Sequence, residues 1–340
     1  MAAPMHRTDI PILLLYDLDL SWQPTDIEEV QREVLPLATS LSALGHPVTV
    51  VAVSSTDLAS VLSVYDPAEY IVFNWCECLP GVPRSDVLVA RKLSMLGFTY
   101  TGSTAPTLAM SWDKILVKSR LQSHGVPTPS ARVYANLEPD GWNRFPAIVK
   151  PAMEHCSVGL TPEAVVLTPE QLHERVAYVI RTFDEPALVE EFIDGRELHI
   201  SLVGNGRVQM LPPAEMDFSA FADVRERLCS FDSKFSPGSR HYEQIQLRLP
   251  AVLDKEVLDL IERTAIRAYR ALNCRDYARL DMRLRDGIPF VLDVNPNADV
   301  SSSTSTAMAA ELVGLSHAEL ISRLVSLAAH RHPTFGAGRH

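Results

Sequence analysis

Polar side chains interrupt two strand-like segments at residues 277–297, which read YARLDMRLRDGIPFVLDVNPN. The first segment carries Arg279 and Asp281, the second carries Asp293 and Asn295, and an Asp-Gly pair typical of a β-hairpin turn lies between them. Carboxylate and amide oxygens are ligands that Mg²⁺ accepts while keeping positions open for phosphate oxygens. The pattern indicates a metal and phosphate site, and the alternative is a solvated hairpin with scattered charge.

The length of the hairpin turn decides whether the two acids meet. A two-residue loop at 286–287 would place Asp281 and Asp293 on opposite faces, because a slip of one residue inverts the facing of a strand. A loop of about three residues, with its glycine in the left-handed region, would place them on the same face. Strict alternation also puts Leu292 in one row with Val294.

Length and composition predict a globular protein of two or three domains. The chain has 340 residues, 46% apolar and 21% charged, and its net charge is −11. This acidity argues against nucleic acid as a partner. No apolar run is long enough to predict a membrane span. The five cysteines are sparse and odd in number, which favours a reducing, cytoplasmic setting. Reduced thiols are favoured over a metal clip for the pair at Cys76 and Cys78.

The first hundred residues alternate between strand and helix patterns. Strands are expected at 10–16, 48–53 and 70–75, with a helix that begins at a Thr25–Glu28 capping box, ends near Gly45 and is followed later by another at about 86–96. This alternation predicts a parallel sheet with helices on its faces.

The rest of the chain mixes hairpins with helices. Helices are expected at about 113–124, from Thr168 as N-cap, at about 251–273 and in two segments near 305–329. Strands are expected in FPAIVKP, in ALVEEFI at 187–193, and on either side of Asn205-Gly206, which favours a type I′ hairpin turn.

Four segments in order resemble the ATP-grasp superfamily, and within it the D-alanine–D-alanine ligases. They are IVKPAMEHCSVG (148–159), LVEEFIDGRE (188–197), FDSKF (231–235) and RLDMRL…FVLDVNPN (279–297). The resemblance implies an α/β fold with a Rossmann-like N-terminal domain at 1–104. It further implies two α+β subdomains, at 105–190 and 191–335, that clamp ATP between antiparallel sheets.

The resemblance also implies roles for individual residues. Nucleotide binding falls to Lys114, Lys150, Glu154, Ser157, Glu190, Glu191, Ile193, Glu197 and Lys234. Within this set the lysines meet phosphates, Glu190 accepts from the adenine amino group, and Glu197 takes the ribose hydroxyls. The metal ligands are Asp281, Asp293 and Asn295, for Mg²⁺ or Mn²⁺ and two ions. The catalytic residues are Arg279, Lys234 and Ser157, with Arg279 on the oxygen of the tetrahedral intermediate.

The implied reaction joins a small-molecule carboxylate to an amine. ATP phosphorylates the carboxylate, an amine attacks the acyl phosphate, and phosphate leaves. The alternatives are a small-molecule kinase on the same scaffold and an ATP-binding module without turnover. The resemblance further implies a homodimer.

The half of the site that would hold amino acids departs from the family pattern. The first strand runs into Tyr16-Asp17-Leu18-Asp19, where the family has a glycine-rich loop, and either acid is an ammonium acceptor or a plain loop residue. Cys156 and Phe235 stand where a hydroxyl and a tyrosine are expected, and Asp299 stands at a glycine position. The reaction type is therefore carried over, and D-alanine as substrate is not.

Overall fold

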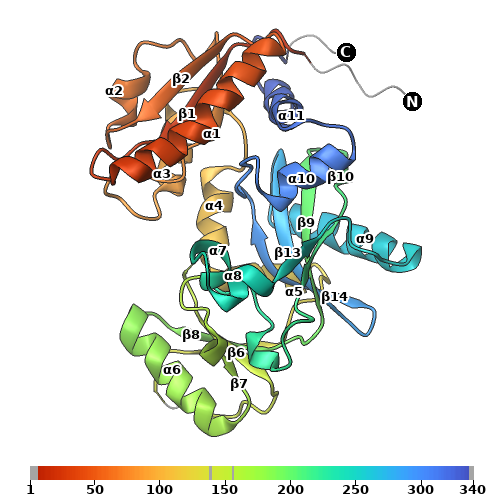
Figure 1. The fold of residues 1–340 in the computed structure, drawn as a ribbon. Coiled ribbons are helices and arrows are strands. Elements are labelled where there is room, and N and C mark those ends of the chain that lie inside the picture. The colour runs from red at the N-terminus through yellow and green to blue at the C-terminus, as the bar shows by residue number, and fades with distance from the viewer. Residues whose placement is uncertain (1–6, 138–139, 155–156, 337–340) are drawn as a thin grey trace.

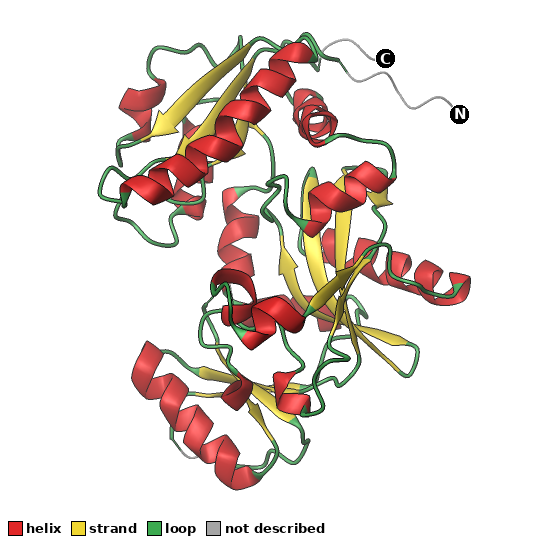
Figure 2. Ribbon diagram, in the orientation of Figure 1, coloured by secondary structure: helices red, strands yellow, loops and turns green. Residues whose placement is uncertain are grey.

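The structure, a computed structural model, describes residues 7–137, 140–154 and 157–336. The strands in this part of the chain lie in three sheets that follow one another along the molecule (Figures 1 and 2). The two later sheets are antiparallel, and the first is parallel. This arrangement confirms the predicted α/β fold of the ATP-grasp type.

The N-terminal sheet is parallel, with strand order β2-β1-β3-β4. Its elements are β1 (Ile12–Asp17), α1 (Pro24–Ala43), β2 (Val48–Val53), α2 (Leu58–Leu62), β3 (Ile71–Trp75), α3 (Asp86–Met95) and β4 (Thr99–Tyr100). Alternate residues of β1 enter two different cores: Ile12 and Leu14 face α1, and Leu13 and Leu15 face α3. The sheet is therefore covered on both faces, which explains why β1 is a continuous apolar run.

The predicted capping box at the start of α1 is wrong. The helix begins at Pro24, and the N-cap residue Gln23 makes no side-chain cap hydrogen bond. Proline suits this first position because its fixed φ is already helical and its missing N–H would have had no partner. The Thr168 cap is confirmed, since its side chain accepts from the Gln171 N–H at the start of α6.

The central sheet is small and antiparallel, with strand order β5-β8-β6-β7. Its elements are β5 (Ala131–Tyr134), β6 (Ala147–Pro151), β7 (Val165–Val166), α6 (Pro169–Phe183) and β8 (Ala187–Glu191). The apolar side of α6 packs on one face of this sheet (Figure 2). Ile148, Lys150 and Glu190 alternate with the strand residues of this core and are directed to the other face.

The C-terminal sheet has the order β12-β11-β9-β13-β14, with β10 paired to β9. Its strands are β9 (Arg196–Gly204), β10 (Val208–Met210), β11 (Ala214–Asp217), β12 (Gln246–Arg248), β13 (Tyr277–Arg285) and β14 (Ile288–Asn295). The nearby helices are α4 (Ala105–Trp112), α5 (Lys114–Ser123), α7 (Asp232–Phe235), α8 (Arg240–Gln244), α9 (Lys255–Ala271), α10 (Ser305–Leu312) and α11 (His317–Ala329). Among these, α4, α7 and α8 were not predicted.

Helices α9 and α5 bury the apolar face of the C-terminal sheet (Figure 1). Leu198, Ile200, Leu280 and Met282 contribute to this core from β9 and β13. Because successive side chains of a strand point to opposite faces, the residues between them are directed to the opposite face. Glu197, His199, Arg279 and Asp281 are among these intervening residues. The covered face thus determines which polar side chains are left for a site.

The predicted type I′ turn at Asn205-Gly206 is wrong. Val208 pairs with Gly204, so three residues form the loop, and the left-handed position is Gly204 with φ +132°. A Cβ on Gly204 would lie 2.2 Å from the carbonyl oxygen of Arg207, so only glycine fits there. Asn205 instead exchanges hydrogen bonds with Asp276: its Nδ2 donates to Oδ1 over 2.9 Å, and its Oδ1 accepts from the Asp276 N–H.

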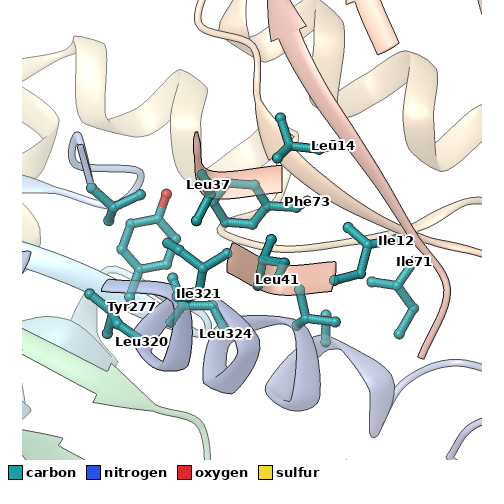
Figure 3. Packing of buried hydrophobic residues seen from close by; sticks show 14 of the residues in the cluster. Ile12, Leu14, Leu37, Leu41, Ile71, Phe73, Tyr277, Leu320, Ile321 and Leu324 are labelled. Atoms are coloured by element: carbon teal, nitrogen blue, oxygen red, sulfur yellow. The ribbon is translucent and has the colours of Figure 1, made fainter. Parts of the chain in front are cut away.

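The last helix of the described chain belongs to the core of the first sheet. Leu320, Ile321 and Leu324 of α11 pack with residues of α1 and β1, and Tyr277 joins them from β13 (Figure 3). Residues more than two hundred positions apart therefore share one core. Among the described residues, no single helix is long and apolar enough to cross a membrane; α10 and α11 pass that test only as a pair bent by 98°.

Asp276 joins three parts of the chain at one buried point. Its carboxylate is fully buried and accepts from both Nη atoms of Arg331, at 2.6 and 2.7 Å, and from the Gly102 N–H at 2.9 Å. Its backbone is left-handed, with φ 66°, a conformation that Asp and Asn tolerate better than most residues. Asp276 thus ties β4, the β9–β10 loop and the end of α11 together.

We expect Asp276→Asn to destabilise the protein by about 2 kcal/mol, because it removes the charge that neutralises Arg331 while keeping the left-handed preference. Denaturant unfolding measures the loss. Asp259→Asn is the control, since its ion pair with Lys255 is at the surface and should contribute less than about 0.5 kcal/mol. Equal midpoints for both variants would contradict this role of Asp276.

Candidate active site on the polar face of the C-terminal hairpin

A β-bulge brings the two acids of the hairpin together. The turn at 286–287 has two residues, both at positive φ (52° and 73°), so by itself it would place Asp281 opposite Leu292. The register shifts by one residue after Met282, and Asp281 lies opposite Asp293 instead. Val291 and Val294 therefore both enter the core, and the strict alternation expected for Leu292 is wrong.

With this register, the polar side chains form three rows across β9, β13 and β14. Arg283 lies opposite Glu197, Asp281 opposite His199 and Asp293, and Arg279 opposite Ser201 and Asn295. Residues directly opposite each other in antiparallel strands have Cβ atoms about 4.5–5.5 Å apart. The predicted residues Glu197, Asp281, Asp293, Asn295 and Arg279 are therefore all brought to one surface.

Arg279 is held as a cation beside Asp281 and Asp293. Its Nε and Nη2 donate to the two carboxylate oxygens of Asp281 over 2.8 and 3.1 Å. Burial works against the charged form, but the carboxylates of Asp281 and Asp293 outweigh it, and the pKa of Arg279 is raised. Next to it, the Nδ2 of Asn295 is buried and has no hydrogen-bond partner among the described residues. A buried amide in that position indicates a missing polar partner.

The donor set of this face fits a magnesium ion. Asp281 and Asp293 present two carboxylates side by side, and Asn295 adds an amide oxygen on the same strand face. Two carboxylates held this close repel each other unless cations neutralise them, and Arg279 supplies only one charge. Oxygen ligands of this kind are what Mg²⁺ prefers.

Glu197 and Arg283 form a buried ion pair at the other end of the face. Arg283 Nε and Nη2 donate to Glu197 Oε2 over 2.9 and 2.7 Å, and Nη1 donates to the Ile193 carbonyl over 2.8 Å. The guanidinium also stacks on Phe192, 4.5 Å from the ring centroid. The carbonyl of Ile193, predicted as part of the nucleotide site, therefore already accepts from Arg283. Strand alternation predicts Arg283 on the same face as Arg279 and Asp281, but no role was predicted for it.

Glu190 is buried against two lysines, Lys150 of β6 and Lys118 of α5. Lys118 and Lys150 each form an ion pair with its carboxylate. Lys150 was predicted as a phosphate ligand, whereas Lys118, one turn after Lys114, was not. Burial lowers the pKa of Lys150 to about 8, although Asp293 raises it. Since the Asp293 charge raises this pKa, Lys150 lies within electrostatic reach of Asp293.

The loop after β6 is anchored on several sides. The Lys114 ammonium donates to the Glu154 carbonyl, Arg84 pairs with the Glu154 carboxylate, and Ser157 Oγ donates to the Cys229 carbonyl over 3.1 Å. Residues 155–156, including Cys156, lie outside the described residues. So do the side chains of Lys234 and Phe235 in α7. Glu191 uses its side chain for an ion pair with Arg285, and its N–H donates to the Ser130 carbonyl.

Acidic side chains gather beyond the Arg279 end of the face. Asp19 is a loop acid, since it accepts from the N–H and hydroxyl of Ser21 and from the Gly81 N–H. Asp17 is different, because burial raises its pKa, and the Glu77 N–H faces it. The Glu77 side chain is exposed, yet surrounding protein and then the charges of Asp299 and Asp17 raise its pKa to about 7.

No role was predicted for Glu77, because the prediction for this segment concerned the thiols of its neighbours Cys76 and Cys78. The Cys76 thiol donates to the Cys78 carbonyl over 3.3 Å, which is a local contact. The available signal was the position of Glu77, the second residue after the end of β3. Ligands bind at the carboxyl ends of strands in open α/β sheets. Asp17 ends β1 at the same edge of the sheet.

Comparison with known proteins places the chain in a family. Residues 122–326 match a family model described as "D-ala D-ala ligase C-terminus", which is more than half of the chain. The uncharacterized protein y4sG of Sinorhizobium fredii is 32% identical over 89% of this chain and 88% of its own length. The D-alanine–D-alanine ligase of Bordetella avium is 32% identical over 71% of this chain and 74% of its own length.

Solved structures agree on the fold. The D-alanine–D-alanine ligase of Bacillus anthracis in complex with ATP has a TM-score of 0.73, with 20% identity, over 95% of this chain and 98% of its own. The corresponding enzyme of Coxiella burnetii has a TM-score of 0.67 over 94% of this chain and 95% of its own. With the family model, these matches show that the chain belongs to the D-alanine–D-alanine ligase family of the ATP-grasp superfamily.

Proposed function

We propose that this protein is an ATP- and Mg²⁺-dependent carboxylate–amine ligase that forms an amide between two small, amino-acid-like molecules. The observation that carries the proposal is the bulged register that puts Asp281 opposite Asp293, with Arg279 and Asn295 in the next row. A solvated hairpin would have no reason to gather two acids, an arginine and an unpaired amide on one face.

The order of the rows supports the way in which ATP would lie. Glu197 stands where the ribose hydroxyls would be accepted, and the acids Asp281 and Asp293 come next along the strands. Arg279 is the last of the series. In the bound reactants, adenosine would come first, the phosphates next and the reacting carboxylate last, which is the same order. The ribose end, the phosphate end and the acyl end thus each have a matching row.

The lysines hold the triphosphate in this proposal. Lys114, Lys150 and Lys234 supply ammonium groups, and Lys118 shares the neutralisation of Glu190 with Lys150. Ser157 and the backbone of the loop that includes Glu154 lie over the phosphates. One or two Mg²⁺ or Mn²⁺ ions, when bound, neutralise charge on the β- and γ-phosphates and align the attacking carboxylate.

The reaction then has two steps. A carboxylate oxygen of the first substrate attacks the γ-phosphorus, the bond to the bridging oxygen breaks, and ADP leaves. The amine of the second substrate attacks the acyl carbon, loses a proton, and displaces phosphate. Arg279 faces the oxygen that becomes negative in the tetrahedral state, where its guanidinium stabilises the charge.

The acids beyond Arg279 favour a substrate with an ammonium group. Asp17, Glu77 and Asp299 are close enough for their charges to interact, and a cation among them would relieve their repulsion. The relatives from Bordetella and Bacillus are D-alanine–D-alanine ligases. The acids here differ from the glycine-rich loop expected at β1, so we propose a rebuilt pocket and do not assign D-alanine.

Other features stay predictions within this proposal. They are the division at 1–104, 105–190 and 191–335, the homodimer, the cytoplasmic location and the lack of a nucleic acid or membrane partner. The small molecules with a carboxylate and an amine are the proposed partners.

A screen for ADP release tests the function. The protein is incubated with ATP, Mg²⁺ and amino acids of both configurations, alone and in pairs, and products are identified by mass spectrometry. Free phosphate that appears only when an amine is present, together with an amide product, supports the ligase. A stable phosphorylated product would make it a kinase, and no ADP across the panel would favour a module without turnover.

We expect Arg279→Ala to lower kcat by about 10²-fold or more while affinity for an ATP analogue is retained, because the arginine acts on the tetrahedral oxygen. Asp293→Asn should nearly abolish turnover because it removes a metal ligand. Steady-state kinetics and analogue titrations measure both effects. The control is Arg270→Ala, an exposed arginine on α9 behind the sheet. Wild-type rates in the two site variants would remove the assignment.

Nucleotide affinity should fall as pH rises above about 8. The Lys150 ammonium is charged below its pKa of about 8 and neutral above it, so its attraction for phosphate is lost in that direction. Titration with a non-hydrolysable ATP analogue between about pH 7 and 9.5 measures the effect without the chemical step. Lys150→Arg is the matched control, because arginine stays charged throughout this range. The same pH dependence in both proteins would assign it to another group.

A further inference from the structure

Three different metal-ligating side chains meet on the polar face, between the ribose end and the phosphate end. Glu197, His199 and Cys229 place a carboxylate oxygen, an imidazole nitrogen and a thiol sulfur all within 4.8 Å of one another. This group differs from the proposed magnesium ligands Asp281 and Asp293, because its donor atoms include nitrogen and sulfur. Neither the family resemblance nor the proposed reaction gives His199 or Cys229 a role.

The fold brings the three side chains together from two directions. Glu197 and His199 are two positions apart on β9, so they share a face about 7 Å apart along the strand. Cys229 comes from the segment between β11 and α7, and its carbonyl accepts from Ser157 Oγ over 3.1 Å. This contact holds the backbone of Cys229 against the loop after β6.

The carboxylate of the group is already oriented. Both hydrogen bonds from Arg283 end on Glu197 Oε2, so the second oxygen remains for another partner. His199 has a carboxylate beside it as well, since Asp281 Oδ1 is 3.9 Å from its Nε2. Charged neighbours that fix a ligand and its ring are the usual surroundings of a protein metal site.

We propose that Glu197, His199 and Cys229 form a zinc-binding site. Thiolate, imidazole and carboxylate together suit Zn²⁺, whereas Mg²⁺ selects oxygen ligands. Tetrahedral zinc with these ligands needs donor atoms roughly 3.3–3.8 Å apart, given its bond lengths. Donor atoms within 4.8 Å can reach that spacing by small side-chain rotations. Three protein ligands leave the fourth position to water.

Zinc at this site excludes nucleotide, because Glu197 cannot serve the ion and the ribose hydroxyls at once. This second part rests on the proposed function, in which Glu197 binds ribose, whereas zinc binding itself does not. A zinc ion bound to the empty site would block nucleotide binding, and a bound nucleotide would block zinc binding.

Zinc binding to the nucleotide-free, full-length protein tests the first part. We expect one zinc per chain by isothermal titration and elemental analysis, and its loss in Cys229→Ser and His199→Gln. Cobalt as a spectroscopic probe should give a thiolate charge-transfer band in the wild type that Cys229→Ser removes. The matched control is Cys78→Ser, a thiol outside the group, which should keep both signals. Circular dichroism establishes that each variant is folded.

Retention of zinc by the Cys229 and His199 variants, or its loss in Cys78→Ser, would overturn the site. So would a wild type that binds no zinc, whatever its ligase activity. Adenosine tests the competition, because ATP itself chelates zinc. At ten times its own Kd, adenosine should weaken zinc binding about tenfold by mass action. An unchanged zinc affinity would reject the competition and the ribose role of Glu197, and would leave the zinc site standing.

Discussion

Repulsion between Asp281 and Asp293 is the constraint around which the polar face is built. The bulge in β14 forces the two carboxylates to lie side by side, where neither sequence alternation nor a plain two-residue turn would have put them. Such a pair is tolerated only when cations lie close by, and Arg279 is the first of these, bonded to both oxygens of Asp281. Lys150 approaches the same acids from the central subdomain. A metal ion bound with the phosphates of ATP would complete the neutralisation. The proposed reactants would thus supply the positive charge that the two carboxylates lack.

The same balance of charge links the two antiparallel sheets. Glu190 of the central sheet holds Lys118 and Lys150, and Glu197 of the C-terminal sheet holds Arg283. Buried ion pairs of this kind are costly to break on one side only, so each side chain depends on its partner to keep its place. Glu197 also belongs to the proposed zinc site with His199 and Cys229. In the two proposals above, this carboxylate, already bonded to Arg283, accepts from ribose or binds zinc according to which of them is present.

Sequence patterns predicted most of this fold, since long apolar runs such as β1 and the Thr168 cap are local signals. They failed where tertiary contacts decide. The bulge at Leu292 follows from the need to bury both Val291 and Val294, which no local pattern shows. Asn205 favoured a tight turn but is used by Asp276, a partner distant in sequence. In the site, Glu197, Arg279, Asp281, Asp293 and Asn295 share one face of the C-terminal sheet, which a two-residue turn without the bulge would not have given. The pairings of Lys118 and Arg283 could not be predicted, because each pairs with a glutamate that only the folded chain brings near.

The position of α11 has a consequence for the order in which the protein can fold. Its leucines and isoleucine complete the core around α1 and β1, although α11 follows every other helix and strand of the described residues. During translation the first sheet therefore keeps an open apolar side until α11 has left the ribosome. A fragment that stops after β4 would keep that side exposed and would be expected to aggregate. The N-terminal unit is thus contiguous in space but not in the chain, and any attempt to produce it alone must supply the final helix as well.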